Sequence, residues 1–264
     1  MNPTGITDVD ELIRAIRVGL QETLGEKLVG LYVFGSIATG GYEHGTSDVD
    51  LLAALSSDLS ADDFARVAAV HEAVLREQSG WEDRIEIAYI STEKLRRIQA
   101  EDQIALVSPG EPVHFKEAGN DWFLNLFLLR EHGLTVFGPP PHSLVDPVSA
   151  GDLTVVQRLM WEWREWITQT DLIHKRAYQG HMIITMCRNL FLWRNLRVAS
   201  KREATAWAAR EMPEWSALIR SALIWREGAV GEHVDQNATL PETLRFVHVV
   251  IDTILAEERT EATP

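Results

Sequence analysis

Two aspartates, Asp48 and Asp50, are two residues apart, a spacing that allows both carboxylates to bind one cation. They lie at the start of an apolar run, residues 49–55, that is expected to be a β-strand, so both side chains leave the same face. Two carboxylates this close repel each other unless a cation lies between them. Because Mg²⁺ prefers oxygen ligands, the pair predicts a magnesium site at an edge of the sheet.

Glu86 is a third carboxylate, within an otherwise mostly apolar run at residues 84–90. The alternation of this run places Glu86 on the face opposite Ile85 and Ile87. A glutamate inside such a strand is unusual unless it is exposed or functional. We therefore expect Glu86 to approach the aspartate pair, to share the metal ions and to accept the proton of an acceptor hydroxyl. The alternative is an edge-strand charge that serves solubility alone.

Gly35 and Ser36 lie where a β-type run, residues 29–34, gives way to a short helical turn. Glycine permits close backbone approach, and the N–H groups of the turn together with the Ser36 hydroxyl can hold a phosphate. Catalysis of phosphoryl and nucleotidyl transfer rests on positioning and charge neutralisation, which a phosphate cradle beside paired carboxylates provides. Each motif alone is a weak signal, but their order along the chain favours a magnesium-dependent nucleotidyltransferase.

Hydrophobic periodicity predicts the elements that position these residues. The first part of the chain is expected to hold helices at 8–24, 61–77 and 121–131 and strands at 29–34, 49–55, 84–90 and 134–137. Prolines at 139–141 and 147 follow, and beyond them we expect helices at 153–170, 181–196, 202–211, 214–226 and 241–258. The pattern predicts an α/β (α+β) catalytic domain with a mixed sheet, residues 1–150, followed by an all-α helical bundle domain, residues 151–264.

The composition narrows the classes of partner. The 264 residues are 45% apolar, which is enough to bury a core. A formal net charge of −14 would repel a phosphate backbone, so no nucleic-acid partner is expected. The single cysteine, Cys187, excludes an internal disulfide and is expected to be a buried apolar residue. With no run of 18 apolar residues and no apolar signal segment, we expect no membrane span and a cytoplasmic monomer.

The stretches at 31–41 and 47–51 resemble the nucleotidyltransferase superfamily that shares the DNA polymerase β-type palm. Segments 133–139, 187–190, 200–204, 207–208 and 246–250 resemble the aminoglycoside nucleotidyltransferases that adenylylate streptomycin and spectinomycin. The resemblance covers nearly the full length. It implies an antibiotic-resistance enzyme that uses Mg²⁺ and ATP and transfers AMP to a hydroxyl of a small cationic aminoglycoside or aminocyclitol.

The resemblance also assigns roles in the first domain. Ser36 matches a residue that contacts the triphosphate, and Ser47 precedes the metal pair as in the family and is expected to touch phosphate as well. Asp48 and Asp50 match the metal ligands. Glu86 matches the carboxylate assigned as catalytic base.

In the second domain, Arg188 and Lys201 match basic residues that reach the nucleotide phosphates. The resemblance thus implies that the helical domain completes the nucleotide and acceptor site. Two cations near the leaving group would stabilise the charge that builds up there. Without the resemblance, an exposed salt bridge would be the expected role of both side chains.

The acceptor site is where the sequence departs from its relatives. Streptomycin-modifying members carry a tryptophan at the position of Ala118. Since sugar and cyclitol faces pack on aromatic rings, Trp166, Tyr178 and Trp122 are candidates for acceptor contact. Asp171 is a further candidate, because relatives place acidic residues before the helix that carries Arg188. Trp163 and Trp166 also fit an apolar helix stripe with a core role. A protein hydroxyl or another metabolite remains an alternative acceptor, and a non-catalytic nucleotide sensor remains an alternative function.

Overall fold

The computed structural model describes residues 2–45, 47–147, 154–227 and 235–257. The chain divides into two compact units, Met1–Pro147 and Val148–Pro264. The first is an α/β unit with a mixed sheet and the second is helical, which confirms the predicted fold class. The predicted domain boundary near residue 150 falls outside the described residues. The predicted first residue of the 153–170 helix and the predicted last residue of the 241–258 helix also fall outside them. Among the described helices, none has both the length and the apolar character needed to cross a membrane.

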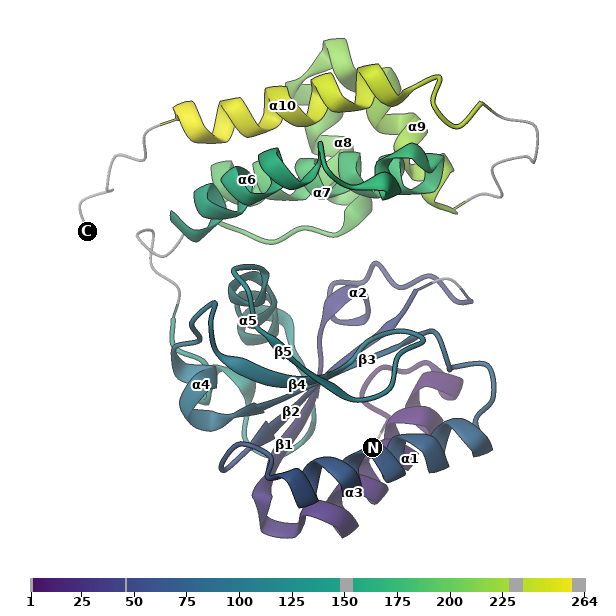
Figure 1. Ribbon diagram of the computed structural model, residues 1–264, viewed down its shortest axis with the longest axis vertical. Helices are drawn as coiled ribbons and strands as arrows, with labels where there is room; N and C mark the ends of the chain where they lie inside the picture. Colours follow the sequence, from purple (N-terminus) through teal and green to yellow (C-terminus); the bar gives the residue numbers. More distant parts are fainter. Residues whose placement is uncertain (1, 46, 148–153, 228–234, 258–264) are drawn as a thin grey trace. The chain divides into compact units, whose positions relative to one another are not determined.

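Six strands form one sheet in the first unit, in the order β5-β4-β3-β2-β1-β6 (Figure 1). They are β1 (Leu28–Val33), β2 (Val49–Leu55), β3 (Ile85–Ser91), β4 (Gln103–Val107), β5 (His114–Glu117) and β6 (Leu134–Phe137). β2 and β3 pair in parallel, and the other neighbours are antiparallel. The sequence predicts β1, β2, β3 and β6 but not β4 and β5, because these short strands lack a clear alternation.

Helices α1 (Thr7–Leu24) and α3 (Ala61–Glu77) pack together on one face of the sheet, as Figure 1 shows. The remaining helical segments of this unit are η1 (Gly25–Lys27), α2 (Gly35–Ala38), α4 (Thr92–Arg96), α5 (Asp121–His132) and η2 (Pro141–Ser143). Odd-numbered residues of β2 and β3, such as Leu51 and Ile87, belong to the hydrophobic core with α1 and α3. Strand alternation therefore directs the even-numbered residues to the opposite face, where Asp50 and Glu86 lie.

Local interactions explain why α3 begins at Ala61. Ser60 and Asp63 form a reciprocal capping box that satisfies backbone N–H groups at the start of the helix. The Asp63 carboxylate also accepts a hydrogen bond from Lys27 Nζ at 2.7 Å, which ties the helix to the segment before β1. These bonds hold the pKa of Asp63 well below its usual range. The predicted limits of this helix match the structure.

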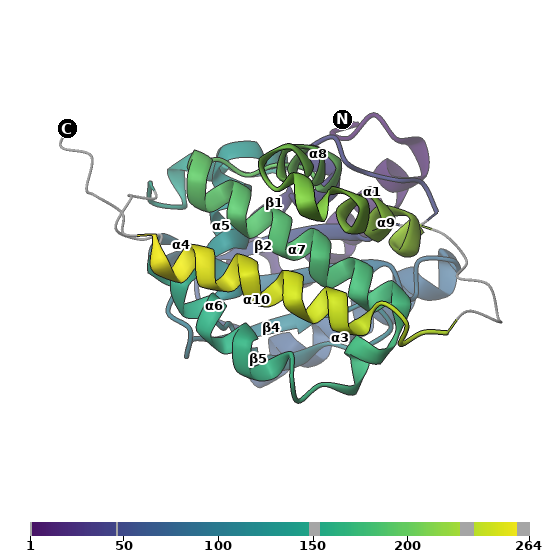
Figure 2. The same cartoon turned by 90° about the horizontal axis from the view of Figure 1, so that it is seen from above.

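The second unit consists of α6 (Thr154–Trp166), η4 (Asp171–His174), α7 (Arg176–Asn195), α8 (Lys201–Glu211), η5 (Pro213–Trp215), α9 (Ser216–Glu227) and α10 (Leu240–Ala256). α7 is central and contacts α8, α9 and α10, and α10 also contacts α6 (Figure 2). α7 begins earlier than the sequence predicts and contains Gly180. A Cβ on Gly180 would come within 2.7 Å of the Ala222 carbonyl oxygen, so this glycine allows α9 to approach closely.

A buried polar residue, Gln179, joins α7 to the chain before and within α10. Its side-chain nitrogen donates to the Gln236 carbonyl at 2.9 Å, and its oxygen accepts hydrogen bonds from the hydroxyls of Thr239 and Thr243. Both ends of the amide are thus satisfied without water, as a buried polar group requires.

The buried His71 provides a test of this fold through pH. Burial lowers the pKa of His71 from 6.5 to about 4, and its ring nitrogen shares a hydrogen bond with the Tyr89 hydroxyl. The unfolded chain binds a proton near pH 6.5 and the folded chain only near pH 4, so the free energy of unfolding falls as pH is lowered through this window. We expect His71 to account for up to about 3 kcal/mol of that loss.

Urea unfolding at pH 7.5, 6 and 5 measures this contribution. In the His71→Gln variant, the loss of unfolding free energy between pH 7.5 and 5 should be smaller than in the wild type. The same substitution at the exposed His142 is the control and should keep the wild-type slope. Equal slopes in all three proteins would contradict the assignment to His71.

Candidate active site

Asp50 and Glu86 are direct neighbours across the parallel pair of β2 and β3. Their Cα atoms are register partners, and both side chains leave the sheet face opposite the α1/α3 core. Both residues are half-buried. The structure therefore brings together these two predicted site residues, which are 36 positions apart in the sequence.

Gly35 lies against the Asp50 carboxylate. The backbone there has φ +64°, and a Cβ built on Gly35 would lie 1.7 Å from Asp50 Oδ2. The N–H of the preceding residue, Phe34, donates to the Asp50 carbonyl at 3.0 Å, so the turn is anchored to β2. Glycine is needed here for two separate reasons, the positive φ and the space occupied by the carboxylate.

Asp48 lies just before β2 and is half-buried. Burial raises the pKa of Glu86, and the negative charge of Asp48 raises it further. Lys116 opposes this effect, and Asp121 adds to it. Asp48 is therefore close enough to act on Glu86 electrostatically, and the same group of charges also contains Lys116 and Asp121.

The donor set of this group fits a hard divalent cation. Carboxylate oxygens are the ligands that Mg²⁺ prefers, and a cation would relieve the repulsion between Asp48 and Glu86. Within the described part of the chain, however, no group of three or more His, Cys, Asp or Glu side chains is arranged to hold a metal ion. Mg²⁺ is usually held by one or two carboxylates together with substrate phosphates. The fit is thus to a cation that arrives with a phosphate group rather than to an all-protein cage.

Ser36 lies within α2, and Ser47 lies near the end of the segment that leads from α2 to β2. The Ser36 carbonyl accepts a hydrogen bond from the Gly41 N–H at 2.8 Å. Ser47 is buried, and its hydroxyl accepts a hydrogen bond from the Glu43 N–H at 3.0 Å. The Ser47 N–H donates back to the Glu43 carbonyl at 2.9 Å, so the loop is closed before it reaches Asp48.

In the helical unit, Arg188 and Lys201 lie near a half-buried histidine, His181, that the sequence did not single out. Burial lowers the pKa of His181 to about 4, and the charges of Arg226, Lys201 and Arg188 lower it further. Arg188 and His181 belong to α7, Lys201 begins α8, and Arg226 belongs to α9. The two predicted phosphate-binding residues are therefore part of one cationic group around His181.

The acceptor candidates of the helical unit fall into two environments. Trp166 and Tyr178 are in ring contact with centroids 6.0 Å apart, and Tyr178 continues to His181 at 5.4 Å. Trp163 contacts Trp166 from within the same helix at 6.0 Å and is half-buried, whereas Trp166 is 39% exposed. Asp171 lies in η4, where its side chain is exposed. Trp163, Trp166, Tyr178 and His181 thus form a chain of ring contacts, the aromatic chain, which ends at the cationic group around His181.

Trp122, the fourth acceptor candidate, has a different environment. It is only 2% exposed and packs against Phe34, with ring centroids 6.3 Å apart. Ala118, the position of the tryptophan in streptomycin-modifying relatives, is fully buried. Because its indole is enclosed, Trp122 packs in the core next to the Gly35 turn.

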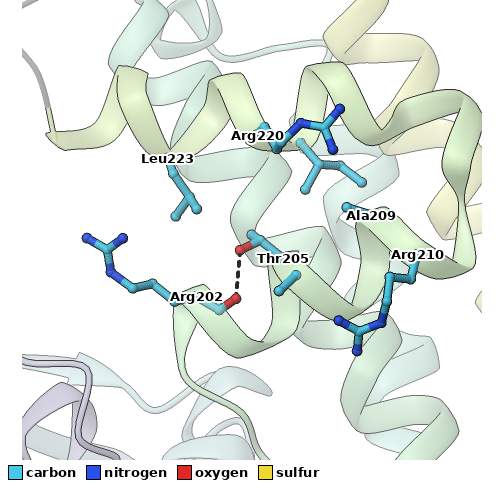
Figure 3. Close-up of a pocket in the computed structure, with 8 residues that line it drawn as sticks. Arg202, Thr205, Ala209, Arg210, Arg220 and Leu223 are labelled. Carbon is cyan, nitrogen blue, oxygen red and sulfur yellow. Dashed lines mark hydrogen bonds between the residues drawn. The ribbon is translucent and has the colours of Figure 1, made fainter.

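A separate cavity of about 320 Å³ lies between α8 and α9 (Figure 3). Arg202, Arg210 and Arg220 flank it, and Ala209 and Leu223 contribute to an apolar lining. Thr205 also lines it and donates its hydroxyl to the Arg202 carbonyl at 3.1 Å. None of the predicted site residues lines this cavity.

Two family models match the chain. A nucleotidyltransferase domain matches residues 13–107, and the C-terminal domain of aminoglycoside adenylyltransferase matches residues 143–252. Together the two matches span most of the chain, in the order of the two compact units. The two parts of the chain thus match, in order, a nucleotidyltransferase domain and the helical domain of an aminoglycoside adenylyltransferase. These matches confirm the predicted resemblance and the prediction that the chain is an enzyme.

Among solved structures, this nucleotidyltransferase is similar to the spectinomycin adenyltransferase AAD(9) from Enterococcus faecialis, whose crystal structure was determined with ATP and spectinomycin. The TM-score is 0.71 at 16% identity, over 92% of this chain and 98% of that chain. The similarity shows that the two proteins share a fold. No curated protein sequence matches the chain significantly.

Lys116, Asp121 and His181 of this nucleotidyltransferase were missed by sequence reasoning. Lys116 belongs to β5, which was not predicted, so nothing in the sequence indicated that it approaches Glu86. Asp121 begins a helix that was predicted, but helical periodicity does not show that Asp121 approaches Glu86. His181 lies three residues after Tyr178 on α7, and this helical spacing could have linked it to the aromatic candidates.

The contact between Gly35 and Asp50 gives a direct test of the site. In Gly35→Ala, the new methyl group must displace the Asp50 carboxylate, so turnover should fall by roughly a hundredfold. The positive φ should also cost about 1–2 kcal/mol of stability, seen as a lower melting temperature.

Gly25→Ala is the matched control. Gly25 also has a positive φ, 52°, but a Cβ there would meet nothing within 4 Å. It should lose stability as Gly35→Ala does and keep wild-type turnover. Equal turnover in the two variants would mean that the position of Asp50 does not matter for catalysis.

Proposed function

We propose that the chain is a magnesium-dependent adenylyltransferase that moves AMP from ATP to a hydroxyl of an aminoglycoside or aminocyclitol such as streptomycin or spectinomycin. The observation that carries this proposal is the register of Asp50 with Glu86, on the sheet face where Gly35 makes room for a carboxylate. The matches to the two family models support nucleotidyl transfer, and the similar structure holds ATP and spectinomycin. Adenylylation of the drug would make the chain an antibiotic-resistance enzyme.

In the proposed reaction, the acceptor hydroxyl oxygen attacks the α-phosphorus of ATP. The new oxygen–phosphorus bond forms as the bond to the β,γ-pyrophosphate breaks, and pyrophosphate leaves with the electron pair. The Glu86 carboxylate accepts the hydroxyl proton. Asp48 and Asp50 would hold Mg²⁺, with Glu86 beside them. Bound Mg²⁺ neutralises phosphate charge and orients the phosphates.

The remaining predicted residues bind the nucleotide in this proposal. Gly35, Ser36 and Ser47 would contact the triphosphate from the α/β unit. Arg188 and Lys201 would contact the leaving pyrophosphate, where their charges stabilise the developing anion. The cationic group around His181 supports this role, because like charges gathered within one unit are favourable when an anion binds among them.

The acceptor is proposed to contact Trp166, Tyr178 and Asp171. An exposed indole in contact with a second aromatic ring offers an apolar face to a sugar or cyclitol, and an exposed carboxylate suits a cationic drug. All three residues belong to the helical unit, Trp166 in α6, Asp171 in η4 and Tyr178 in α7.

A second candidate keeps the chemistry and changes the acceptor to a protein hydroxyl or another metabolite. It is favoured by the buried alanine at position 118, where streptomycin-modifying relatives carry a tryptophan. A non-catalytic nucleotide sensor is disfavoured, because all three carboxylates are retained and Glu86 is electrostatically coupled to Asp48.

Pyrophosphate release tests the proposal. Purified protein with MgATP should release pyrophosphate in the presence of at least one member of a panel of aminoglycosides and aminocyclitols. Asp50→Asn should reduce that release to background because it removes a charge from the proposed ion site. The control is Asp62→Asn, at a side chain that is 84% exposed on α3, which should behave as the wild type.

The outcomes separate the candidates. If no drug of the panel causes pyrophosphate release while ATP binding is intact, the antibiotic acceptor is eliminated. Labelling of lysate proteins or metabolites by radioactive ATP would then support the second candidate. Unchanged turnover in Asp50→Asn would eliminate the proposed metal site itself.

The aromatic chain of the helical unit predicts how acceptor binding responds to mutation. Trp166→Ala should raise the KM for the drug roughly three- to tenfold, because it removes an aromatic packing surface worth about 1 kcal/mol, and should leave the KM for MgATP unchanged. Trp161→Ala is the control, since Trp161 is 58% exposed and stacks on Arg164 instead. If both variants keep the wild-type KM for the drug, Trp166 is not part of the acceptor site.

A further inference from the structure

Arg84 immediately precedes β3 and makes an unusual set of contacts with the loop that carries the first aspartate. Its guanidinium donates to the Ser47 carbonyl oxygen from Nη2 at 3.0 Å and from Nε at 3.3 Å. Nη2 also donates to the Tyr42 hydroxyl at 3.3 Å. A single planar fork thus binds two points of the loop that leads into β2.

The backbone of Arg84 binds the same loop from the other side of Asp48. The Val49 N–H donates to the Arg84 carbonyl at 2.8 Å. Asp48 is therefore flanked by two peptide groups, one before it and one after it, that both hydrogen-bond to Arg84. Fixing the carbonyl of residue 47 and the N–H of residue 49 restricts the backbone dihedrals of Asp48, and with them the direction of its carboxylate.

The guanidinium is itself held in place. Its central carbon lies 4.5 Å from the centre of the Trp81 ring, within the range of a cation–π interaction. Trp81 is buried, and its carbonyl accepts a hydrogen bond from the Arg84 N–H at 3.1 Å. The stacked ring reduces the freedom of the arginine side chain, so the bonds to Ser47 and Tyr42 cost less conformational entropy.

The position of Arg84 also relates the carboxylates to one another. Arg84 precedes Glu86 by two residues, so the segment that binds the backbone around Asp48 continues directly into the strand that carries Glu86. The bonds of Arg84 therefore link the backbone around Asp48 to the start of the strand that carries Glu86.

We propose that Arg84 is a positioning residue that sets the direction of the Asp48 carboxylate toward a metal-bound nucleotide. The inference rests on the proposed function, because the role of Asp48 as a metal ligand belongs to it. Arg84 acts through the Ser47 and Val49 peptide groups and touches no substrate. Lysine at this position would keep the charge but could not bridge Ser47 and Tyr42 in one plane.

Two variants, Arg84→Gln and Arg84→Lys, test the proposal with readouts that do not all require turnover. Hydrogen exchange of the metal-free protein should be faster in the segment around residues 42–49 of Arg84→Gln. The rise in melting temperature caused by Mn²⁺ with a non-hydrolysable ATP analogue should fall to half or less. In turnover with an active drug, kcat should fall roughly ten- to a hundredfold while the KM for the drug stays within about twofold. Arg84→Lys should recover only part of each effect.

Arg130→Gln is the matched structural control. Arg130 also donates its guanidinium to two backbone carbonyls of the same unit, those of His142 and Val145. It should lower the melting temperature of the unliganded protein and leave the shift caused by Mn²⁺ and analogue unchanged. If Arg84→Gln behaves in the same way, Arg84 is structural only and the proposal is wrong.

The design separates this proposal from the proposed function. A wild-type protein that binds Mn²⁺ and analogue but turns over no acceptor would contradict the function, and the exchange and melting data would still decide the role of Arg84. Slow exchange around residues 42–49 in Arg84→Gln, equal to that of the wild type, would overturn the positioning role whatever the turnover.

Discussion

The parallel pairing of β2 with β3 imposes an electrostatic constraint on which the rest of the α/β unit depends. It places Asp50 and Glu86 at partner positions and brings Asp48 close enough to raise the pKa of Glu86. Carboxylates this close to each other repel. The strands are held instead by their other face, where alternate residues are buried against α1 and α3. The buried face of the strand pair stabilises the fold, and the opposite face carries the repelling carboxylates.

The unit fixes its first two carboxylates by different means. Asp50 is positioned inside a regular strand, and the turn at Gly35 gives it room because that residue has no side chain. Asp48 lies outside the ladder and depends on the peptide groups on either side of it, both of which hydrogen-bond to Arg84. A residue within a strand is positioned by the sheet, whereas a residue before it needs a bond of its own. This difference explains why the loop into β2 carries so many side-chain contacts.

The sequence predicts those features that follow from periodicity and from short motifs. Alternation placed Asp48, Asp50 and Glu86 on one face, because strand geometry has a fixed period of two. It could not predict β5, whose exposed residues lack an apolar pattern, and so it missed Lys116 beside Glu86. The sequence also could not show how far Trp122 is enclosed. A tryptophan in a helix can serve a pocket or a core, and only the packing against Phe34 distinguishes the two.

The two units carry local charges of opposite sign, within a chain whose net charge is −14. The α/β unit gathers carboxylates around Glu86, and the helical unit gathers Arg188, Lys201 and Arg226 around His181. Each group keeps several charges of one sign close together in partly buried surroundings. Taken separately, a divalent cation is complementary to the carboxylates of the first group, and phosphate groups are complementary to the basic side chains of the second. Burial and these charges lower the pKa of His181 to about 4, so its imidazole adds no positive charge to the group near neutral pH.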